Sequence, residues 1–416
     1  MYDKQLKIYT LIFITLTTVL FIGAYNISKI SILLILYINI LILTFLCYKK
    51  YDLKIIYLII FQWLIYIIFL IIHKYFIDLI GSGNDDIRFE KLAINYYNYY
   101  LYGIEPNIFQ SSTLYSHILG IFYYFGGYQV LVPGLLNITI HSLTIILLYN
   151  IYVLVLKTVN GALLTCILYT IYPLTMFNTI ITLREIIIIL FLMLFVYTFL
   201  LFYVYRNWGF LILSILSLGL GSLFHIGFIG FFLFYAIYIL VFSNFNSVLK
   251  ILLSSIFLLI LKVYINTTEN SKIVSNIDSK TKDFDGNSSR ADYLKHEATS
   301  GFINDLIFKV KQEIYFMFKP FFWEIRNFAD LLGFFNLFFI LLGILIAVYV
   351  YRKTNNKRII ILLTMILTFY FVFALGTYNY GTALRHRDKA SMLLTLFIPY
   401  FYYFKLKKRK AIVYKK

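Results

Sequence analysis

The chain has 416 residues, of which 61% are hydrophobic, 20% aromatic and only 13% charged. A soluble domain cannot bury so much apolar surface, so the composition excludes an ordinary globular protein and indicates a polytopic membrane protein. The 37 Lys and Arg outnumber the 19 Asp and Glu, which gives a formal net charge of +18. Because these basic residues gather between apolar runs, we expect them to face a membrane surface, and we expect no nucleic-acid partner.

Apolar runs long enough to cross a bilayer recur along the chain. A helix needs roughly 20 apolar residues to span the hydrocarbon layer, and about twelve stretches approach that length. They lie near residues 8–25, 29–48, 54–73, 130–156, 161–179, 185–205, 208–224, 226–243, 247–265, 332–351, 358–376 and 391–404. We therefore predict an all-α protein with a single integral-membrane domain over residues 1–416 and both termini in the cytoplasm.

Basic residues occupy every connection that this topology leaves in the cytoplasm, as the positive-inside rule requires. They are Lys49, Lys50, Lys54, Lys157, Arg206, Lys250, Arg352, Lys353, Lys357, Arg358 and the basic tail at 405–416. Two larger external loops are expected, at 74–129 and 266–331, and the second holds ten of the nineteen acidic residues. Within them, the runs 114–125 and 302–328 are typical of helices that lie along a membrane surface.

The first external loop carries two adjacent carboxylates, Asp85 and Asp86, followed by Arg88. In this acid-poor chain, either carboxylate is a candidate to deprotonate an acceptor hydroxyl. The pair is also a candidate to hold Mg²⁺ or Mn²⁺ on a phosphate leaving group. The alternative is that these are solvated loop charges, or carboxylates that cap the helix expected from Phe89 to Tyr102.

Three further polar sites are candidates for substrate binding. Arg184-Glu185 opens the apolar run at 185–205, after a kink expected at Pro173; Arg184 would hold a phosphate, or the two would form an interfacial ion pair. His225 occupies a tight external turn, where a packing role is the simpler interpretation. Arg290, in the second external loop, is a substrate contact or a plain loop residue.

The last cluster, Arg385-His386-Arg387-Asp388-Lys389, directly precedes the final apolar run. Its basic residues lie outside, against the positive-inside trend, so we expect a function to require them there. Arg385, Arg387 and Lys389 together suit a pyrophosphate, with His386 in support. The alternative is a cluster that binds lipid headgroups.

An external Asp-Asp soon after an early span, followed by an aromatic helix and a Gly-x-x-Pro segment at 103–106, resembles the first loop of the GT-C glycosyltransferases. This superfamily includes protein mannosyltransferases and bacterial lipid-A sugar transferases. The clusters at 183–185, 224–225 and 379–387 resemble those of multi-span proteins of capsule and O-antigen synthesis, some of which are Wzy-type polymerases. The resemblance implies a sugar donor on a polyprenyl-phosphate or -pyrophosphate carrier, with Asp85 or Asp86 as base or metal ligand.

We therefore predict a bacterial cytoplasmic-membrane enzyme that transfers a sugar from this carrier to a lipid-linked or surface glycan acceptor. The acidic pair and the C-terminal basic cluster would share one outward-facing pocket, with Arg385, Arg387 and Arg184 on the donor phosphate. Three alternatives stay open: a polymerase of lipid-linked repeat units, a flippase of lipid-linked sugars, and a purely structural membrane protein. Transporters commonly have duplicated halves and charges near mid-membrane, and the sequence has neither.

Overall fold

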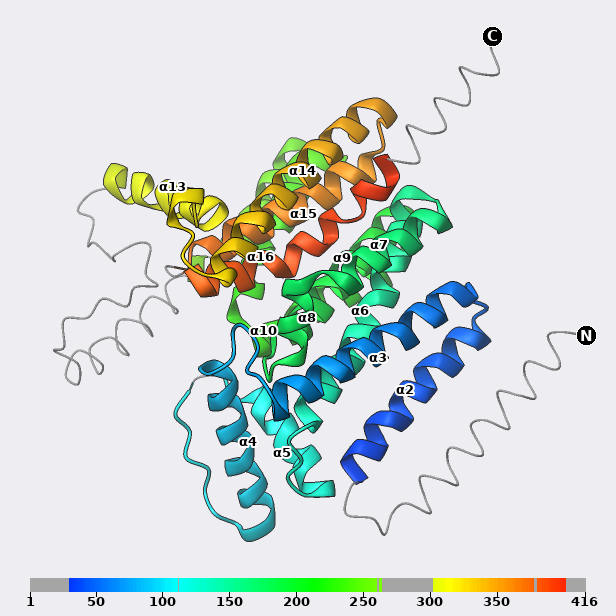
Figure 1. The fold of residues 1–416 in the computed structure, drawn as a ribbon. Coiled ribbons are helices and arrows are strands. Elements are labelled where there is room, and N and C mark those ends of the chain that lie inside the picture. Colours follow the sequence, from blue (N-terminus) through cyan, green and yellow to red (C-terminus); the bar gives the residue numbers. More distant parts are fainter. Residues whose placement is uncertain (1–29, 111, 260–261, 264–301, 378–379, 402–416) are drawn as a thin grey trace, which may run out of the picture. The chain divides into compact units, whose positions relative to one another are not determined.

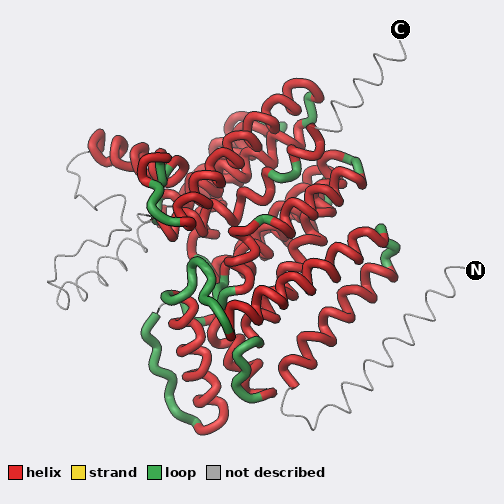
Figure 2. The backbone as a smooth tube through the Cα atoms, viewed as in Figure 1, coloured by secondary structure: helices red, strands yellow, loops and turns green. Residues whose placement is uncertain are grey.

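The computed structural model describes residues 30–110, 112–259, 262–263, 302–377 and 380–401. Over these ranges the backbone is helix, turn or loop, without a strand (Figure 2). The all-α, polytopic membrane fold is therefore confirmed. The expected first span at 8–25, Arg290 and the basic tail lie outside the described residues.

Six helices are long and apolar enough to cross a membrane, and they coincide with expected spans. They are α2 (Ile30–Tyr48), α3 (Leu53–Tyr75), α6 (Val132–Leu156), α9 (Glu185–Tyr205), α14 (Phe328–Thr354) and α15 (Lys357–Ala374). Shorter apolar helices occupy three further expected positions: α10 (Trp208–Phe224), η2 with α11 (Ile226–Phe231 and Phe232–Phe242), and Ser247–Leu259. The total of twelve spans stays a prediction.

A proline breaks the expected span at 161–179 into two helices. α7 (Val159–Ile171) and α8 (Pro173–Ile180) meet at a bend of 60°. Pro173 occupies the first position of α8, where its missing N–H is not needed, and Tyr172 before it is extended. The predicted kink is confirmed, and it leaves α7 and α8 as either a broken span or a re-entrant pair.

The chain forms two compact units, residues 1–194 and 195–416, and each is described by itself. In the first unit, α3, α7 and α8 pack around α6, and α2 packs on α6. Beyond the end of α3, α4 (Asp85–Tyr102) and α5 (Leu114–Gly126) lie along each other (Figure 1). Gly120 permits their close approach, because a Cβ there would meet Tyr96 Cβ at 2.7 Å.

A buried polar network joins three helices inside the first unit. The Tyr66 hydroxyl of α3 donates to the Thr170 carbonyl of α7 (2.9 Å) and lies 3.3 Å from His141 Nε2 of α6. The His141 ring also stacks on Tyr169 of α7. Since these groups lie in apolar helices, mutual hydrogen bonding offsets the cost of burying them and fixes how the helices pack.

In the second unit, α14, α15 and α16 (Tyr380–Leu394) form a bundle. η2 and α11 pack on one side of α15, and α13 (Phe302–Phe318) packs on α15 and α16. Gly230 allows the contact with α15, since a Cβ there would lie 2.2 Å from Val372 Cγ1. The second unit therefore gathers η2, α13, α15 and α16 around the C-terminal basic cluster.

The start of α16 corrects one sequence-based boundary. The basic cluster was expected to precede the final helix, which was placed near residue 391. Instead α16 begins at Tyr380, so the cluster lies within it, and Arg387, Asp388 and Lys389 are fully buried. Hydropathy misses this helix because its charged residues resemble a loop, whereas neighbouring helices surround them in the fold.

Candidate functional site

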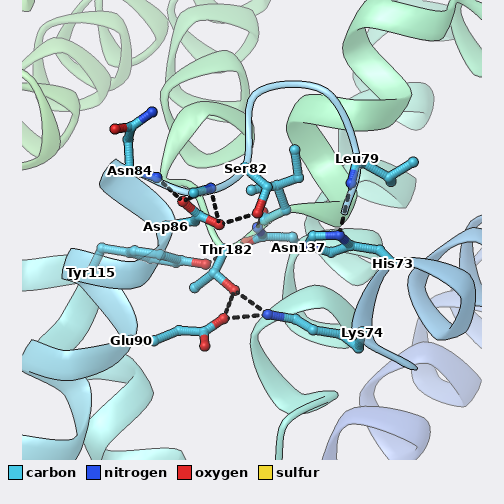
Figure 3. Close-up of polar contacts among 12 residues, drawn as sticks. His73, Lys74, Leu79, Ser82, Asn84, Asp86, Glu90, Tyr115, Asn137 and Thr182 are labelled. Carbon is cyan, nitrogen blue, oxygen red and sulfur yellow. Dashed lines mark hydrogen bonds and ion pairs between the residues drawn. The ribbon is translucent and has the colours of Figure 1, made fainter. Parts of the chain in front are cut away.

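Asp86 holds the loop that leads into α4. Its carboxylate accepts hydrogen bonds from the Ser82 hydroxyl (2.5 Å) and from the backbone N–H groups of Gly83 and Asn84 (both 2.9 Å; Figure 3). Gly83 adopts φ +98°, a conformation that favours glycine. Asp86 is the second residue of α4, whose cap residue is Asn84, and it reaches back to hold the loop that precedes the helix.

The same bonds decide the charge of Asp86. Burial alone would raise its pKa, but the Ser82 hydroxyl and the N–H groups of Gly83, Asn84 and Ile87 outweigh burial, and the pKa lies below its ordinary value. Asp86 therefore stays ionised at neutral pH. Because N–H and O–H donors already face its oxygens, Asp86 does not fit the role of a metal ligand.

Across the described ranges, no three His, Cys, Asp or Glu side chains lie close enough together to hold a metal ion. The predicted Mg²⁺ or Mn²⁺ at the acidic pair stays a prediction, and the geometry of Asp86 gives it no support.

Asp85 differs from its neighbour in exposure. As the first residue of α4, its side chain is 43% exposed and lies 4.0 Å from Arg88, which is more exposed still. Consecutive helical residues project about 100° apart, so Asp85 turns away from the loop that Asp86 binds. Of the two carboxylates, Asp85 is the one that an acceptor hydroxyl can reach.

Below Asp86 lies a second polar cluster that the sequence analysis missed. Glu90 Oε1 is held by Lys74 Nζ and by the Thr182 hydroxyl, and Lys74 Nζ lies 3.4 Å from Thr182 Oγ1 (Figure 3). The cluster joins the end of α3, the first turns of α4 and the α8–α9 connection. One signal was present: Glu90 follows Asp86 by four residues, a spacing that places both on one face of a helix.

The α8–α9 connection is fixed from inside the first unit. Asn137 Nδ2 donates to the carbonyls of Ile181 (3.2 Å) and Leu183 (3.0 Å), and its Oδ1 accepts from the Tyr115 hydroxyl (3.2 Å). This brings Arg184 next to the α4–α5 hairpin.

Arg184 Nη1 bonds to Ser112 Oγ, and the guanidinium lies 5.7 Å from the centre of the Phe89 ring. Glu185 starts α9, as predicted, and is buried. A role for Arg184 on a phosphate stays a prediction.

In the second unit, three basic residues of α16 share a face. Arg385 and Lys389 are one turn apart, and His386 lies beside them, because residues i and i+4 align on a helix. Lys389 Nζ donates to His386 Nδ1 (2.5 Å) and lies 5.5 Å from the centre of the Phe373 ring of α15. Arg385 is half-buried. We call Arg385, His386 and Lys389 the basic face.

His225, between α10 and η2, packs against the basic face. Its ring stacks on Phe373 at 4.7 Å and meets His386 edge-on at 5.1 Å. Its Nδ1 accepts from the Gly227 N–H (3.1 Å), so the ring caps the start of η2. The sequence placed His225 at a tight turn correctly but treated it apart from the α16 cluster, to which the fold joins it.

The Arg387 side chain does not lie on the basic face and points toward α13 instead. Two residues along from Arg385, it projects about 160° away, and its Nη1 donates to the Met317 carbonyl (2.8 Å). Asp388, also buried, offsets one of the three positive charges of the cluster. The structure therefore favours a positioning role for Arg387, although it was predicted to bind phosphate with Arg385.

An apolar groove of about 280 Å³ runs between α11 and α15. It is lined by Leu233, Ile237, Thr364, Leu367, Thr368 and Phe371. The four α15 residues repeat at helical spacing and so form one stripe. Phe373, the ring that packs on His225 and His386, lies two residues after Phe371 and so projects about 160° away from this stripe. The groove and the basic face therefore lie on different sides of α15.

The buried carboxyl group of Glu313 in α13 should make the stability of the folded protein depend on pH. Its Oε2 is buried and has no hydrogen-bond partner within the described part of the chain, and burial raises the pKa of Glu313 from 4.5 to about 7. The folded protein thus binds a proton that the unfolded chain releases between these values. This contribution to stability is complete below about pH 4.5 and is lost as pH rises through about 7.

We expect Glu313→Gln to raise the melting temperature at pH 8 and to change it little at pH 5, because the amide needs no proton. Thermal unfolding scans of the purified protein at both pH values measure this. Glu105→Gln, at an exposed acid, is the matched control. An equal shift at pH 5 and pH 8 would contradict the assignment.

No family model matches the sequence, and no curated protein matches it. The structure, however, is similar to that of the archaeal oligosaccharyltransferase AglB from Archaeoglobus fulgidus, solved with an inhibitory peptide and a dolichol-phosphate. The TM-score is 0.51 at 15% identity, over 89% of this chain and 52% of AglB. Over the aligned part, the chain has the membrane fold of AglB.

The chain spans about half the length of AglB. At 15% identity the similarity establishes the fold, and the GT-C resemblance seen in the sequence is confirmed at that level. The donor, the acceptor and the residues that act on them are matters of proposal.

Proposed function

We propose that the chain is a membrane glycosyltransferase that takes a sugar from a polyprenyl-phosphate-linked donor and passes it to a glycan acceptor. The observation that carries this proposal is the basic face with His225, which packs among the apolar helices of the second unit. A lipid phosphate needs cations for its phosphate, and the exposed apolar helices of a membrane protein supply surface for its hydrocarbon chain. The AglB structure, which contains a dolichol-phosphate, supports the same ligand class.

The donor binds with its phosphate on the basic face. Half-buried Arg385 and His225 contact the phosphate oxygens, since these two side chains keep some exposure. Lys389 lies behind them, fully buried against Phe373, and adds positive potential where water cannot screen it. Arg387 holds α16 against α13 through Met317 and so positions this face.

The pattern of basic residues supports an outward orientation. Arg352, Lys353, Lys357 and Arg358 surround the α14–α15 connection. Positive-inside placement puts that connection in the cytoplasm. The opposite end of α15, with Phe373 and the basic face, then opens on the outer side of a bacterial cytoplasmic membrane.

The acceptor oxygen attacks the anomeric carbon of the donor sugar as a general base takes its proton. The bond between that carbon and the phosphate oxygen breaks, and the phosphate leaves with the electron pair. We assign the role of base to Asp85 in the first unit and the stabilisation of the phosphate to the basic face in the second unit; that the two share one pocket stays the prediction made from the sequence. Asp86 holds Asp85 at the start of α4 through the 82–84 loop, and no step passes through a metal ion.

A polymerase of lipid-linked repeat units would use the same basic face and base with a larger donor. Comparing lipid-linked glycans in a deletion strain separates the two functions: truncated repeats accumulate if a transferase is lost, and complete single repeats if a polymerase is lost. Plasmid-borne Asp85→Asn or Arg385→Met should fail to restore the wild-type pattern. Unchanged glycans in the deletion strain, or full rescue by both variants, would overturn the proposal and favour a structural or flippase role.

A further inference from the structure

A row of aromatic rings lies across the C-terminal ends of α4 and α5. The Tyr100 ring centre is 5.7 Å from that of Tyr99 and 5.9 Å from that of Tyr124. The Phe125 ring follows, 5.5 Å from Tyr124. Tyr99, Tyr124 and Phe125 are 40%, 47% and 57% exposed. We call these four side chains the aromatic row, and the two helices together make it one continuous surface.

Contacts between α4 and α5 hold the row in place. The Tyr100 hydroxyl shares a hydrogen bond with His117 Nε2 (2.6 Å), and the His117 ring meets Tyr96 edge-on at 4.6 Å. A tyrosine side chain has only two torsions, so fixing its ring costs little conformational entropy. The exposed rings are therefore preformed for a ligand, which lowers the cost of binding it.

The chemistry of the row suits a neutral sugar. Each tyrosine joins an apolar ring face to a hydroxyl that donates and accepts, and a pyranose ring offers the complement, C–H groups beside hydroxyls. The row carries no charged side chain, so it offers no cation to a phosphate or an anionic lipid headgroup. On the exposed side of α4, Arg88 and Lys91 interrupt the apolar side chains. α4 thus lacks the unbroken apolar face with which a helix inserts into a membrane.

Asp85 lies on the same side of α4 as the row. Tyr99 follows Asp85 by about four helical turns, so the two side chains project in nearly the same direction, roughly 21 Å apart along the helix axis. Asn95, one turn before Tyr99, is fixed by the bond from its Nδ2 to the Asn107 carbonyl (3.1 Å). A ligand that touches both Asp85 and the row must therefore be a chain of several sugars, because one sugar is too short.

We propose that the aromatic row binds the inner sugars of an oligosaccharide acceptor whose reacting hydroxyl lies at Asp85. The identity of this ligand rests on the proposed transfer function, to which the row adds the acceptor class: a glycan of several sugars, with neutral sugars on the rings. The row lies far from the bond that forms, so it contributes equally to binding before and during the reaction. Its loss should therefore raise the acceptor KM and leave kcat unchanged.

Acceptor kinetics test the row with two probes: the lipid-linked glycan that accumulates in the deletion strain, and the methyl glycoside of its terminal sugar. We expect Tyr99→Ala/Tyr124→Ala to raise the KM of the glycan by about tenfold or more, because two stacking rings are lost. The KM of the methyl glycoside should not change, since one sugar at Asp85 does not reach the row. Tyr99→Phe/Tyr124→Phe keeps both rings and should stay close to wild type. Tyr57→Ala, at a 65% exposed tyrosine of α3, is the control and should alter neither KM.

Calorimetry with the same glycan, released from its lipid, measures the row without any reaction. We expect the wild-type protein to bind the glycan, and the double Ala variant to bind it at least about tenfold more weakly. Absence of binding by wild type, or undiminished binding by the double Ala variant, would overturn the proposal and leave the row to lipid. An equal rise in KM for both acceptors would overturn it too. Glycan binding that depends on the row in a protein that transfers no sugar would instead overturn the transfer function and support the row.

Discussion

Replacing Lys389 by Met should raise the KM for the lipid-linked donor by about 10- to 100-fold, because the phosphate loses the positive potential of a buried cation that water does not screen. Lys389 is fully buried, bonds to His386 and lies beside Phe373, where its charge acts through a poorly polarisable medium. Met keeps most of the volume, so folding should be largely preserved. Steady-state kinetics with donor extracted from the deletion strain give the value.

Two other variants separate this effect from general damage. Arg206→Met removes an exposed cation at the α9–α10 connection and should leave the donor KM unchanged. Arg387→Met breaks the bond to the Met317 carbonyl and should lower the melting temperature, in keeping with a positioning role. A Lys389→Met protein with a wild-type donor KM would remove the basic face from the proposed mechanism.

Variants of the two adjacent carboxylates, Asp85 and Asp86, should have different effects: one should lose activity and the other should lose stability. Asp85→Asn should lower kcat by about 10²- to 10⁴-fold, the usual contribution of a general base, with an unchanged melting temperature. Asp86→Asn should lower stability by about 1–3 kcal/mol, because an amide cannot accept all the bonds from the 82–84 loop. Initial rates and thermal unfolding of the two purified variants measure the contrast.

The pH dependence of folding stability supplies a control for the structural role of Asp86. Its pKa is lowered in the folded protein, so the stability it contributes is present above its ordinary pKa and is lost as pH falls through the folded value. In acid, the Asp86→Asn protein should therefore be about as stable as wild type. If Asp85→Asn retained full activity, or Asp86→Asn unfolded like wild type at neutral pH, the division of roles would be wrong.

The sequence predicted features that depend on local signals. Hydropathy located the six long spans, Pro173 marked the bend between α7 and α8, and the helices at 85–102 and 114–126 began close to their expected positions. These succeed because span length and proline stereochemistry act over short stretches of chain.

Features set by tertiary packing were not predictable in this way. Nothing local pairs His225 with His386, or Lys74 with Glu90 and Thr182. The direction of Arg387 became evident only once its cluster proved to be helical, because a helix sends residues two apart to opposite sides. The expectation that the acidic pair and the basic cluster share one pocket concerns both units and stays a prediction.

The central claim is that this chain binds a lipid phosphate at the basic face. Native mass spectrometry of the purified protein with a polyprenyl phosphate, and with the uncharged polyprenol as reference, tests it most directly. We expect one phosphate-bearing lipid per chain, little binding of the polyprenol, and at least about tenfold weaker binding by Arg385→Met/Lys389→Met. Equal binding of phosphate and alcohol, or undiminished binding by the double variant, would contradict the claim.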